Sequence, residues 1–150
     1  MHYETSAHAR PGCECRHNVN YWRFGDYLGI GAGAHSKLSF ADRIVRQLRF
    51  KQPKQYLEQV AVGDTLQETI EITRRDLPFE FMLNALRLTA GVPAALFAER
   101  TGMPLSIAAR PIAEATRRGL LDPDPTVLRP TPLGRRFLND LQSLFLESPR

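Results

Sequence analysis

The stretch that decides the fold runs Asp76-Leu77-Pro78-Phe79-Glu80-Phe81-Met82-Leu83-Asn84-Ala85-Leu86. Asp76 suits the N-cap of a helix, and Pro78 falls in the first turn, where the missing N–H of proline costs nothing. Apolar side chains then recur at intervals of three and four residues, namely Phe79, Met82, Leu83 and Leu86. This spacing predicts a helix with one apolar face.

The residues that follow continue in the same helical texture. In chain order they predict helices over 93–100 and 104–118, a small two-stranded loop over 120–129 and a closing helix from Thr131. Gly102 and Gly119 are expected to cap the first two helices, and Pro111 to kink or break the second. The closing helix is expected to gather its apolar side chains on one face, namely Phe137, Leu138, Leu141, Leu144 and Phe145. The order of these elements predicts a winged-helix-like module.

The first fifty residues are rich in glycine and aromatic side chains instead. The expected elements up to residue 60 are an extended segment over 3–9, a hairpin from 38–40 and 44–48, and a short helix over 53–60. The run Tyr27-Leu28-Gly29-Ile30-Gly31-Ala32-Gly33-Ala34 predicts a buried strand that ends in a glycine-rich turn. The alternation over 66–72 fits either a strand or a helix.

The composition is that of an ordinary folded protein. The chain has 150 residues, of which 43% are hydrophobic and 24% charged, so one domain or a small domain with an appendage is expected. The net charge of +4 arises from 20 basic and 16 acidic residues, a mixture that does not require a nucleic-acid partner. No apolar run is long enough to cross a bilayer, and we expect a cytoplasmic protein.

A cluster of aromatic and polar residues forms the first candidate site. His17-Asn18-Val19-Asn20-Tyr21-Trp22 places the only tryptophan beside a histidine, two amides and a tyrosine. Such a set can bind a flat ligand, because aromatic rings stack, amides orient the ligand, and an imidazole ligates a metal or donates a proton. The alternative interpretation places Tyr21 and Trp22 in the core and His17 at a turn.

The glycine-rich run forms the second candidate site. Backbone amides in such a turn can meet a phosphate, a carboxylate or an adenosine group, and His35 lies where the strand is expected to end. The glycines alternate at every second position, however, which is not the spacing of a dinucleotide fingerprint. Tight packing of the strand inside a barrel is an equally good interpretation.

Two further patterns are weaker. Cys13-Glu14-Cys15 is a poor match to a structural zinc site, and two cysteines so close together do not make a secreted disulfide framework. The second helix of the helix–turn–helix carries Arg110, Arg117 and Arg118, which would suit DNA. Asp122 and Asp124 in the wing would repel phosphate, so that a structural role is favoured over binding nucleic acid.

Several motifs, taken in order, resemble the second half of the coproporphyrinogen oxidase-like radical SAM proteins. They are Tyr3-Glu4-Thr5-Ser6-Ala7, His17-Asn18-x-x-Tyr21-Trp22, residues 26–35, Phe79-Glu80-Phe81-Met82-x-Asn84-x-Leu86-Arg87-Leu88, Gly119-Leu120-Leu121, residues 128–134 and Phe137-Leu138-Asn139. The resemblance spans nearly the whole chain. Its H-N-x-x-Y-W element points to the haem-chaperone branch of the family and not to the true oxidase.

The resemblance implies a fold of mixed α+β or α/β class. Residues 1–50 would be the last strands of an incomplete radical SAM (β/α) barrel, 51–75 a connecting segment, and 76–150 a helical, winged-helix-like C-terminal domain. His17 would be the ligand of haem iron. The remaining cofactor-binding residues would be Asn18, Tyr21, Trp22, Gly31, Gly33 and His35. His8 and His35 stay open as alternative haem ligands, and Arg23 and Arg46 as partners of the propionates.

The family binds a 4Fe–4S cluster and S-adenosylmethionine through a CxxxCxxC motif, which this sequence lacks. We therefore expect the cluster and S-adenosylmethionine only in a full-length parent, and no catalytic residue in this chain alone. The expected partners are haem or a porphyrin, together with the missing half of the barrel or a client protein that receives haem. The alternative function is a winged-helix-type module that binds nucleic acid or protein.

Overall fold

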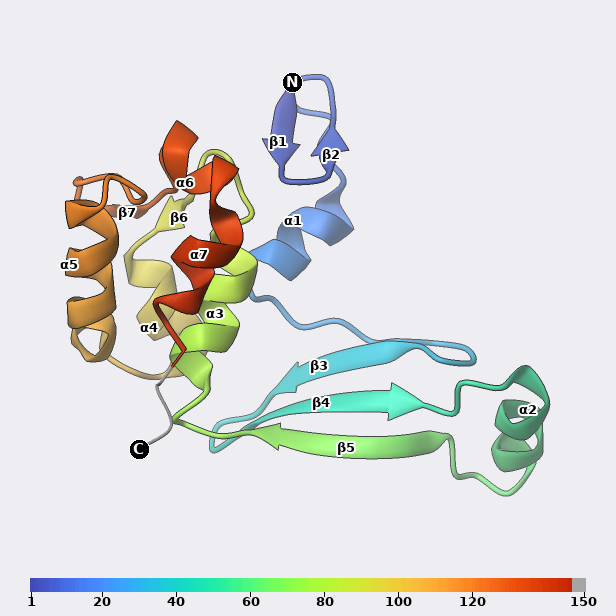
Figure 1. Ribbon diagram of the computed structural model, residues 1–150. Helices are drawn as coiled ribbons and strands as arrows, with labels where there is room; N and C mark the ends of the chain where they lie inside the picture. Colours follow the sequence, from blue (N-terminus) through green and yellow to red (C-terminus); the bar gives the residue numbers. More distant parts are fainter. Residues whose placement is uncertain (147–150) are drawn as a thin grey trace. The chain divides into compact units, whose positions relative to one another are not determined.

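The computed structural model describes residues 1–146, which form two compact units (Figure 1). Unit 1 combines residues 1–25 with the residues from Arg74 onward, and unit 2 comprises Asp26–Thr73. These units differ from the expected segments 1–50, 51–75 and 76–150, because residues 1–25 pack with the C-terminal part of the chain. The assignment of 1–50 to the end of a barrel stays a prediction.

Unit 1 contains most of the helices. Its elements are β1 (His2–Glu4), β2 (Ala7–His8), α1 (Arg16–Trp22), α3 (Leu77–Ala85), β6 (Val92–Pro93), α4 (Ala95–Thr101), the 3₁₀ helix η1 (Leu105–Ala108), α5 (Ala109–Arg117), β7 (Val127–Leu128), α6 (Pro132–Arg136) and α7 (Leu138–Ser143). β1 and β2 form an antiparallel hairpin, and β6 pairs antiparallel with β7. The expected extended segment 3–9 is therefore a tight hairpin that turns at Thr5 and Ser6.

The core of unit 1 is built on α3, and the predicted helix is confirmed with Asp76 at its N-cap. Phe81 is fully buried and contacts Phe24 and Phe97 edge to face, with ring centroids 5.7 and 5.2 Å apart. The predicted apolar face is partly wrong, since Phe79 is only half-buried. Other elements cover α3 on more than one side. Phe81 lies outside the predicted apolar face and is nevertheless buried.

Phe24 ends the segment that carries α1 in a conformation unusual for a bulky residue. Its φ angle is +57°, in the left-handed region that residues with a Cβ atom rarely adopt. The side chain is 1% exposed, and its contact with Phe81 holds it in place. Burial of the ring thus compensates for backbone strain and anchors the chain to the core just after α1.

The N-terminal hairpin is attached to the residues after α3. Thr5 N–H donates to the carbonyl of Arg87 at 3.1 Å, and Thr89 N–H donates to the carbonyl of Tyr3 at 3.0 Å. Glu4 and Leu88 form an antiparallel bridge between these two hydrogen bonds. The hairpin is therefore extended by a short third strand from a distant part of the sequence.

A buried carboxylate reinforces this attachment. Glu4 is 1% exposed, and its Oε1 accepts hydrogen bonds from the Ser6 N–H at 3.0 Å and the Ser6 hydroxyl at 2.7 Å. Its Oε2 lies 3.4 Å from Nη2 of Arg87. A buried charge is tolerated only when it is paired and hydrogen-bonded, and Glu4 satisfies both conditions.

The first two helices predicted after residue 93 lie close to their expected bounds. α4 ends at Gly102, whose φ of +66° makes the predicted left-handed cap. The expected helix over 104–118 consists of η1 followed by α5, and it is not kinked at Pro111. Pro111 is the third residue of α5, where no intrahelical partner exists for a backbone N–H, and so proline is tolerated there.

The closing region begins as predicted and then departs from the prediction. Thr131 caps α6, its hydroxyl accepting the Gly134 N–H at 3.0 Å. The prediction of a single closing helix is wrong, because the helix is interrupted at Phe137, which has φ −114°, ψ 47° and an exposed side chain. The two-stranded loop over 120–129 is also corrected. β7 pairs with β6, and Leu121 makes only an isolated bridge to Pro130.

Unit 2 is a three-stranded antiparallel sheet with a helix between its last two strands (Figure 1). Its elements are β3 (His35–Ser39), β4 (Ile44–Arg49), α2 (Pro53–Ala61) and β5 (Leu66–Ile72), with strand order β3-β4-β5. The predicted hairpin and short helix are confirmed. The ambiguous segment 66–72 is a strand.

A buried lysine helps to hold unit 2 together. Lys37 is 2% exposed and its Nζ lies 2.9 Å from Oδ1 of Asp26. Partial burial opposes ionisation of Asp26, but hydrogen bonds from Ser39 and Lys37 outweigh it and lower the pKa of the carboxyl. Asp26 therefore carries its negative charge at neutral pH and compensates the charge of Lys37.

The predicted buried strand over 27–34 is wrong. Only Tyr27 pairs, in an isolated bridge with Lys37, whereas Leu28 and Ile30 are 70% and 88% exposed. Gly31 and Gly33 adopt φ angles of +99° and +71°, which interrupt an extended backbone. The alternating glycines therefore serve the turns of a loop.

We predict that Gly134→Ala destabilises unit 1 by about 1–3 kcal/mol, because overpacking forces a backbone shift. A Cβ atom at this buried position would overlap the carbonyl oxygen of Leu120. Urea unfolding followed by circular dichroism measures the change. The control Arg135→Ala, at an exposed position of the same helix, should stay within about 0.5 kcal/mol of the parent chain. Equal stability of the two variants would contradict the close approach.

We predict that Glu4→Gln lowers the free energy of unfolding by about 1–3 kcal/mol, since it weakens hydrogen bonds to a buried charged group. Glu99→Gln is the matched control, because Glu99 is exposed in α4 of the same unit. The control should change stability by less than about 0.5 kcal/mol. A neutral result for Glu4→Gln would show that the carboxylate does not anchor the hairpin.

Candidate functional site

The residues of the H-N-x-x-Y-W element form helix α1 in unit 1. Residues four apart lie on the same side of a helix. His17 and Tyr21 therefore share one side of α1, and Asn18 and Trp22 share the adjacent one. Asn18 and Trp22 hold the helix in place, Tyr21 is half-buried, and His17 is exposed.

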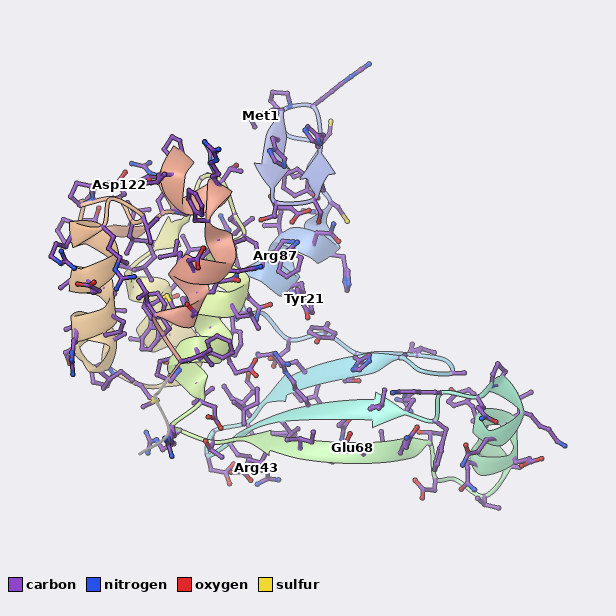
Figure 2. All side chains as sticks on the ribbon, in the orientation of Figure 1. Met1, Tyr21, Arg43, Glu68, Arg87 and Asp122 are labelled. Atoms are coloured by element: carbon purple, nitrogen blue, oxygen red, sulfur yellow. The ribbon has the colours of Figure 1, made fainter. Side chains whose placement is uncertain are left out.

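Asn18 and Trp22 anchor the helix to the hairpin and to the segment after α3. Asn18 Nδ2 donates to the hydroxyl of Tyr3 at 3.3 Å. The guanidinium of Arg87 lies over the Trp22 ring, 4.3 Å from its centroid, and Arg87 is drawn close to α1 in Figure 2. Because Arg87 also pairs with Glu4, one cation connects the buried carboxylate to the aromatic ring.

His17 and Tyr21 present an imidazole and an aromatic ring. His17 is exposed and Tyr21 is half-buried. The Tyr21 ring stands perpendicular to that of Trp22, with centroids 4.6 Å apart, so that the tyrosine has a fixed orientation. An accessible imidazole beside an oriented ring can ligate a metal ion held in a flat ligand.

A cavity of about 460 Å³ lies beside α1. Arg16, Arg23 and Arg100 line it, with Glu14 as the acidic side chain among its lining residues. Glu14 faces the Gly12 N–H, its Oε1 accepting at 3.3 Å. Three cations around one carboxylate favour an anionic ligand.

The other predicted site residues lie in unit 2. Gly31 and Gly33 form the loop before β3, and His35 is the exposed first residue of that strand, paired with Leu48. The structure thus gathers His17, Asn18, Tyr21 and Trp22 on one helix of unit 1 and the other three residues within one segment of unit 2. The two groups do not share a unit.

Sequence reasoning missed Glu4 and Arg87 as residues that support the site. Both belong to motifs that carry the family resemblance, yet nothing local indicates that they pair, because 82 residues separate them in the chain. A charge between two apolar residues, as in Leu86-Arg87-Leu88, is the one available signal. Such a position often means that the charged group is enclosed and has a partner.

Metal-ligating groups are sparse. Cys13 and Cys15 are free and exposed. Within residues 1–146, no three or more His, Cys, Asp or Glu side chains are placed to hold one metal ion. The two cysteines of the sequence are fewer than the three thiolates of a CxxxCxxC cluster site, so the residues present do not fit a 4Fe–4S cluster. No helix over the same residues has the length and apolarity to span a membrane.

The arginines of α5 are largely occupied. Glu114 binds both Arg117 and Arg118, at 2.7 and 2.6 Å, and these hydrogen bonds lower the pKa of Glu114 to about 2. In the following turn Arg129 pairs with Asp122 at 2.7 Å. The positive charges that would contact a phosphate backbone are therefore shared with carboxylates, which argues against a nucleic-acid surface.

Residues 72–137 match the family described as the HemN C-terminal domain. The chain is similar to the heme chaperone HemW of Escherichia coli, with 41% identity over 145 residues, and to that of Haemophilus influenzae, with 43% identity. Each match covers 96% of this chain and 37% of the relative. The chain therefore spans little more than a third of the length of these relatives.

A solved structure agrees with the fold. Coproporphyrinogen III oxidase (HemN) from Escherichia coli, described as a radical SAM enzyme, superimposes with a TM-score of 0.55 and 23% identity over 81% of this chain and 28% of its own. This likeness confirms the mixed α+β class. Together with the sequence matches, it identifies the chain as a homologue of the C-terminal part of the heme chaperone HemW that carries the HemN C-terminal domain.

Proposed function

We propose that this chain is the haem-binding part of a HemW-type haem chaperone, with His17 as the axial ligand of the haem iron. The observation that carries the proposal is that His17 is exposed on a helix that its neighbours in the motif anchor. Asn18 and Trp22 hold α1 against Tyr3 and Arg87. His17 is thereby exposed on a helix that is itself fixed, as an axial ligand requires.

The donor set fits haem chemically. Imidazole is a common axial ligand of haem iron, and the porphyrin is flat and largely apolar. Tyr21 lies one helical turn from His17 and offers a ring against which part of the macrocycle can pack. When bound, haem supplies an iron centre that can be passed to another protein.

The propionates of haem need cationic partners. The cavity beside α1 supplies Arg16, Arg23 and Arg100. Guanidinium groups bind carboxylates in bidentate geometry and are the side chains best suited to this task. Arg23 directly follows α1 and is exposed, which makes it our first choice among these three.

Gly31, Gly33 and His35 are proposed to border the cofactor cavity in the full-length protein. The loop leaves the Gly31 position open, since no atom lies within 4 Å of a Cβ built there. His35 is exposed at the start of β3 and remains an alternative axial ligand, as does His8. Arg46, on β4, remains a second candidate for the propionates.

We infer that cluster-dependent chemistry, if the full-length protein performs any, belongs to the remainder of a longer chain. A 4Fe–4S cluster that binds S-adenosylmethionine needs three thiolates, and the sequence offers two cysteines. No catalytic step is therefore assigned to these residues. The proposed partners are haem, the remaining part of a HemW-type protein and a client that receives the haem.

We propose that residues 1–50 form the last strands of a radical SAM barrel in the full-length protein, with 51–75 as the connecting segment. We propose also that α4, η1, α5 and the turn before β7 form a winged-helix-like arrangement. The helix–turn–helix order and the short β6–β7 pairing support it. The ion pairs of Glu114 make a structural role for this arrangement more suitable than nucleic-acid binding.

We predict saturable haem binding that depends on His17. The parent chain should shift the Soret band of added haem, and His17→Ala should weaken binding by about tenfold or more, since a lost ligand costs at least about 1.4 kcal/mol. His8→Ala and His35→Ala are the matched controls, because each removes one exposed histidine. If His17→Ala bound haem with unchanged affinity and one control lost binding, the axial ligand would be the histidine that this control replaces.

We predict that Arg23→Gln weakens haem binding about two- to fivefold while the Soret maximum stays in place. An exposed ion pair contributes up to about 1 kcal/mol, and the axial ligand is unaffected. Arg43→Gln is the control, because Arg43 is an exposed arginine of unit 2 that pairs with Asp42. Equal affinity of both variants would exclude Arg23 as a propionate partner.

A further inference from the structure

We propose that His2 and His8 form a second site, distinct from the proposed axial ligand His17, that binds a divalent transition-metal ion of the class that prefers imidazole. Cu²⁺, Ni²⁺ and Zn²⁺ belong to this class. The two imidazoles project from opposite strands of the β1–β2 hairpin. The site would use these two ring nitrogens and complete its coordination with water.

The register of the hairpin brings the two rings together. Met1, at the open end of the hairpin, exchanges both backbone hydrogen bonds with Ala9, at 2.7 and 3.0 Å. The next pair, His2 opposite His8, therefore occupies the non-hydrogen-bonded position, where side chains of an antiparallel pair approach most closely. Their rings are stacked, with centroids 4.3 Å apart and planes within 5°.

Donor nitrogens remain available in both rings. His2 Nε2 lies 3.2 Å from the carbonyl oxygen of Thr5, which leaves Nδ1 of His2 for a metal ion. No hydrogen bond from any residue between 1 and 146 reaches the ring of His8. The lone pairs of the two stacked rings lie in parallel planes, so both exposed side chains must rotate out of the stack to direct a nitrogen to a shared ion.

Each ring can supply one imidazole nitrogen, a ligand that copper, nickel and zinc ions bind well. With both rings rotated out of the stack, a zinc ion would bind about 2.0–2.1 Å from one nitrogen of each ring. No third side chain in the described residues completes a cluster, so the site would exchange its metal readily.

Metal binding here would also fasten the hairpin that supports α1. The same hairpin carries Tyr3, whose hydroxyl accepts the Asn18 amide, and Glu4, which pairs with Arg87. Cross-linking His2 to His8 would hold the two strands in register. The site is thus a clamp for the hairpin as well as a ligand site.

The test is a titration of the whole chain with Zn²⁺, Ni²⁺ and Cu²⁺ in the absence of haem, followed by calorimetry and by the melting temperature. We expect affinity to be highest for Cu²⁺, as the stability order of divalent metals requires. His2→Phe and His8→Phe should each weaken binding by about tenfold or more. Phenylalanine keeps a stacked ring and removes the ligand, so the melting temperature without metal should change little.

Three controls separate this site from other ligands. His17→Phe should retain full metal binding, because the axial ligand proposed for haem plays no part. Cys13→Ser with Cys15→Ser should also retain it. Loss of binding in the cysteine variant would overturn the proposal, since the thiols would then be the ligands. Loss of binding in His2→Phe but not in His8→Phe would also overturn it, since His2 and the chain's amino group would then be the ligands. Absence of binding to the parent chain would overturn it equally, whatever the haem titration gives.

Discussion

The structure of unit 1 depends on the attachment of the N-terminal hairpin to the residues after α3. Two backbone hydrogen bonds and one antiparallel bridge join the strands, and the buried Glu4 carboxylate pairs with Arg87 beside them. Leaving that carboxylate without its partners would cost several kcal/mol, so the polar groups specify one register for the junction. Arg87 then covers Trp22, and the position of α1 follows from that contact.

The candidate site inherits its rigidity from this junction. α1 is only seven residues long, and an isolated helix of that length is at best marginally stable in water. Three contacts hold it in place: Tyr3 binds Asn18, Arg87 covers Trp22, and the strained Phe24 after the helix is buried. A ligand that meets His17 therefore meets a preformed surface, and little conformational freedom is lost on binding.

Sequence patterns predicted what is local. The helix after Asp76, the start of the closing helix at Thr131 and the β3–β4 hairpin each follow from spacing or side-chain chemistry within a few residues. The H-N-x-x-Y-W residues were also expected to lie together, because they are neighbours in the sequence. The ion pair of Glu4 with Arg87, which supports α1, was not predictable, because the two residues are far apart in the sequence and come together only in the folded chain. The loop over 27–34 was misjudged because its glycines adopt left-handed angles that an apolar pattern does not reveal.

The separation between Glu4 and Arg87 has a consequence for how the protein folds. Their sequence positions differ by 83, and closing a loop of that size costs about 4 kcal/mol of chain entropy. At a synthesis rate of about 5–20 residues per second, the hairpin waits roughly 4–17 s on the ribosome before its partner strand exists. The helix that carries His17 thus gains its anchor only after Arg87 has been made, by which time all residues of unit 2 have been synthesised.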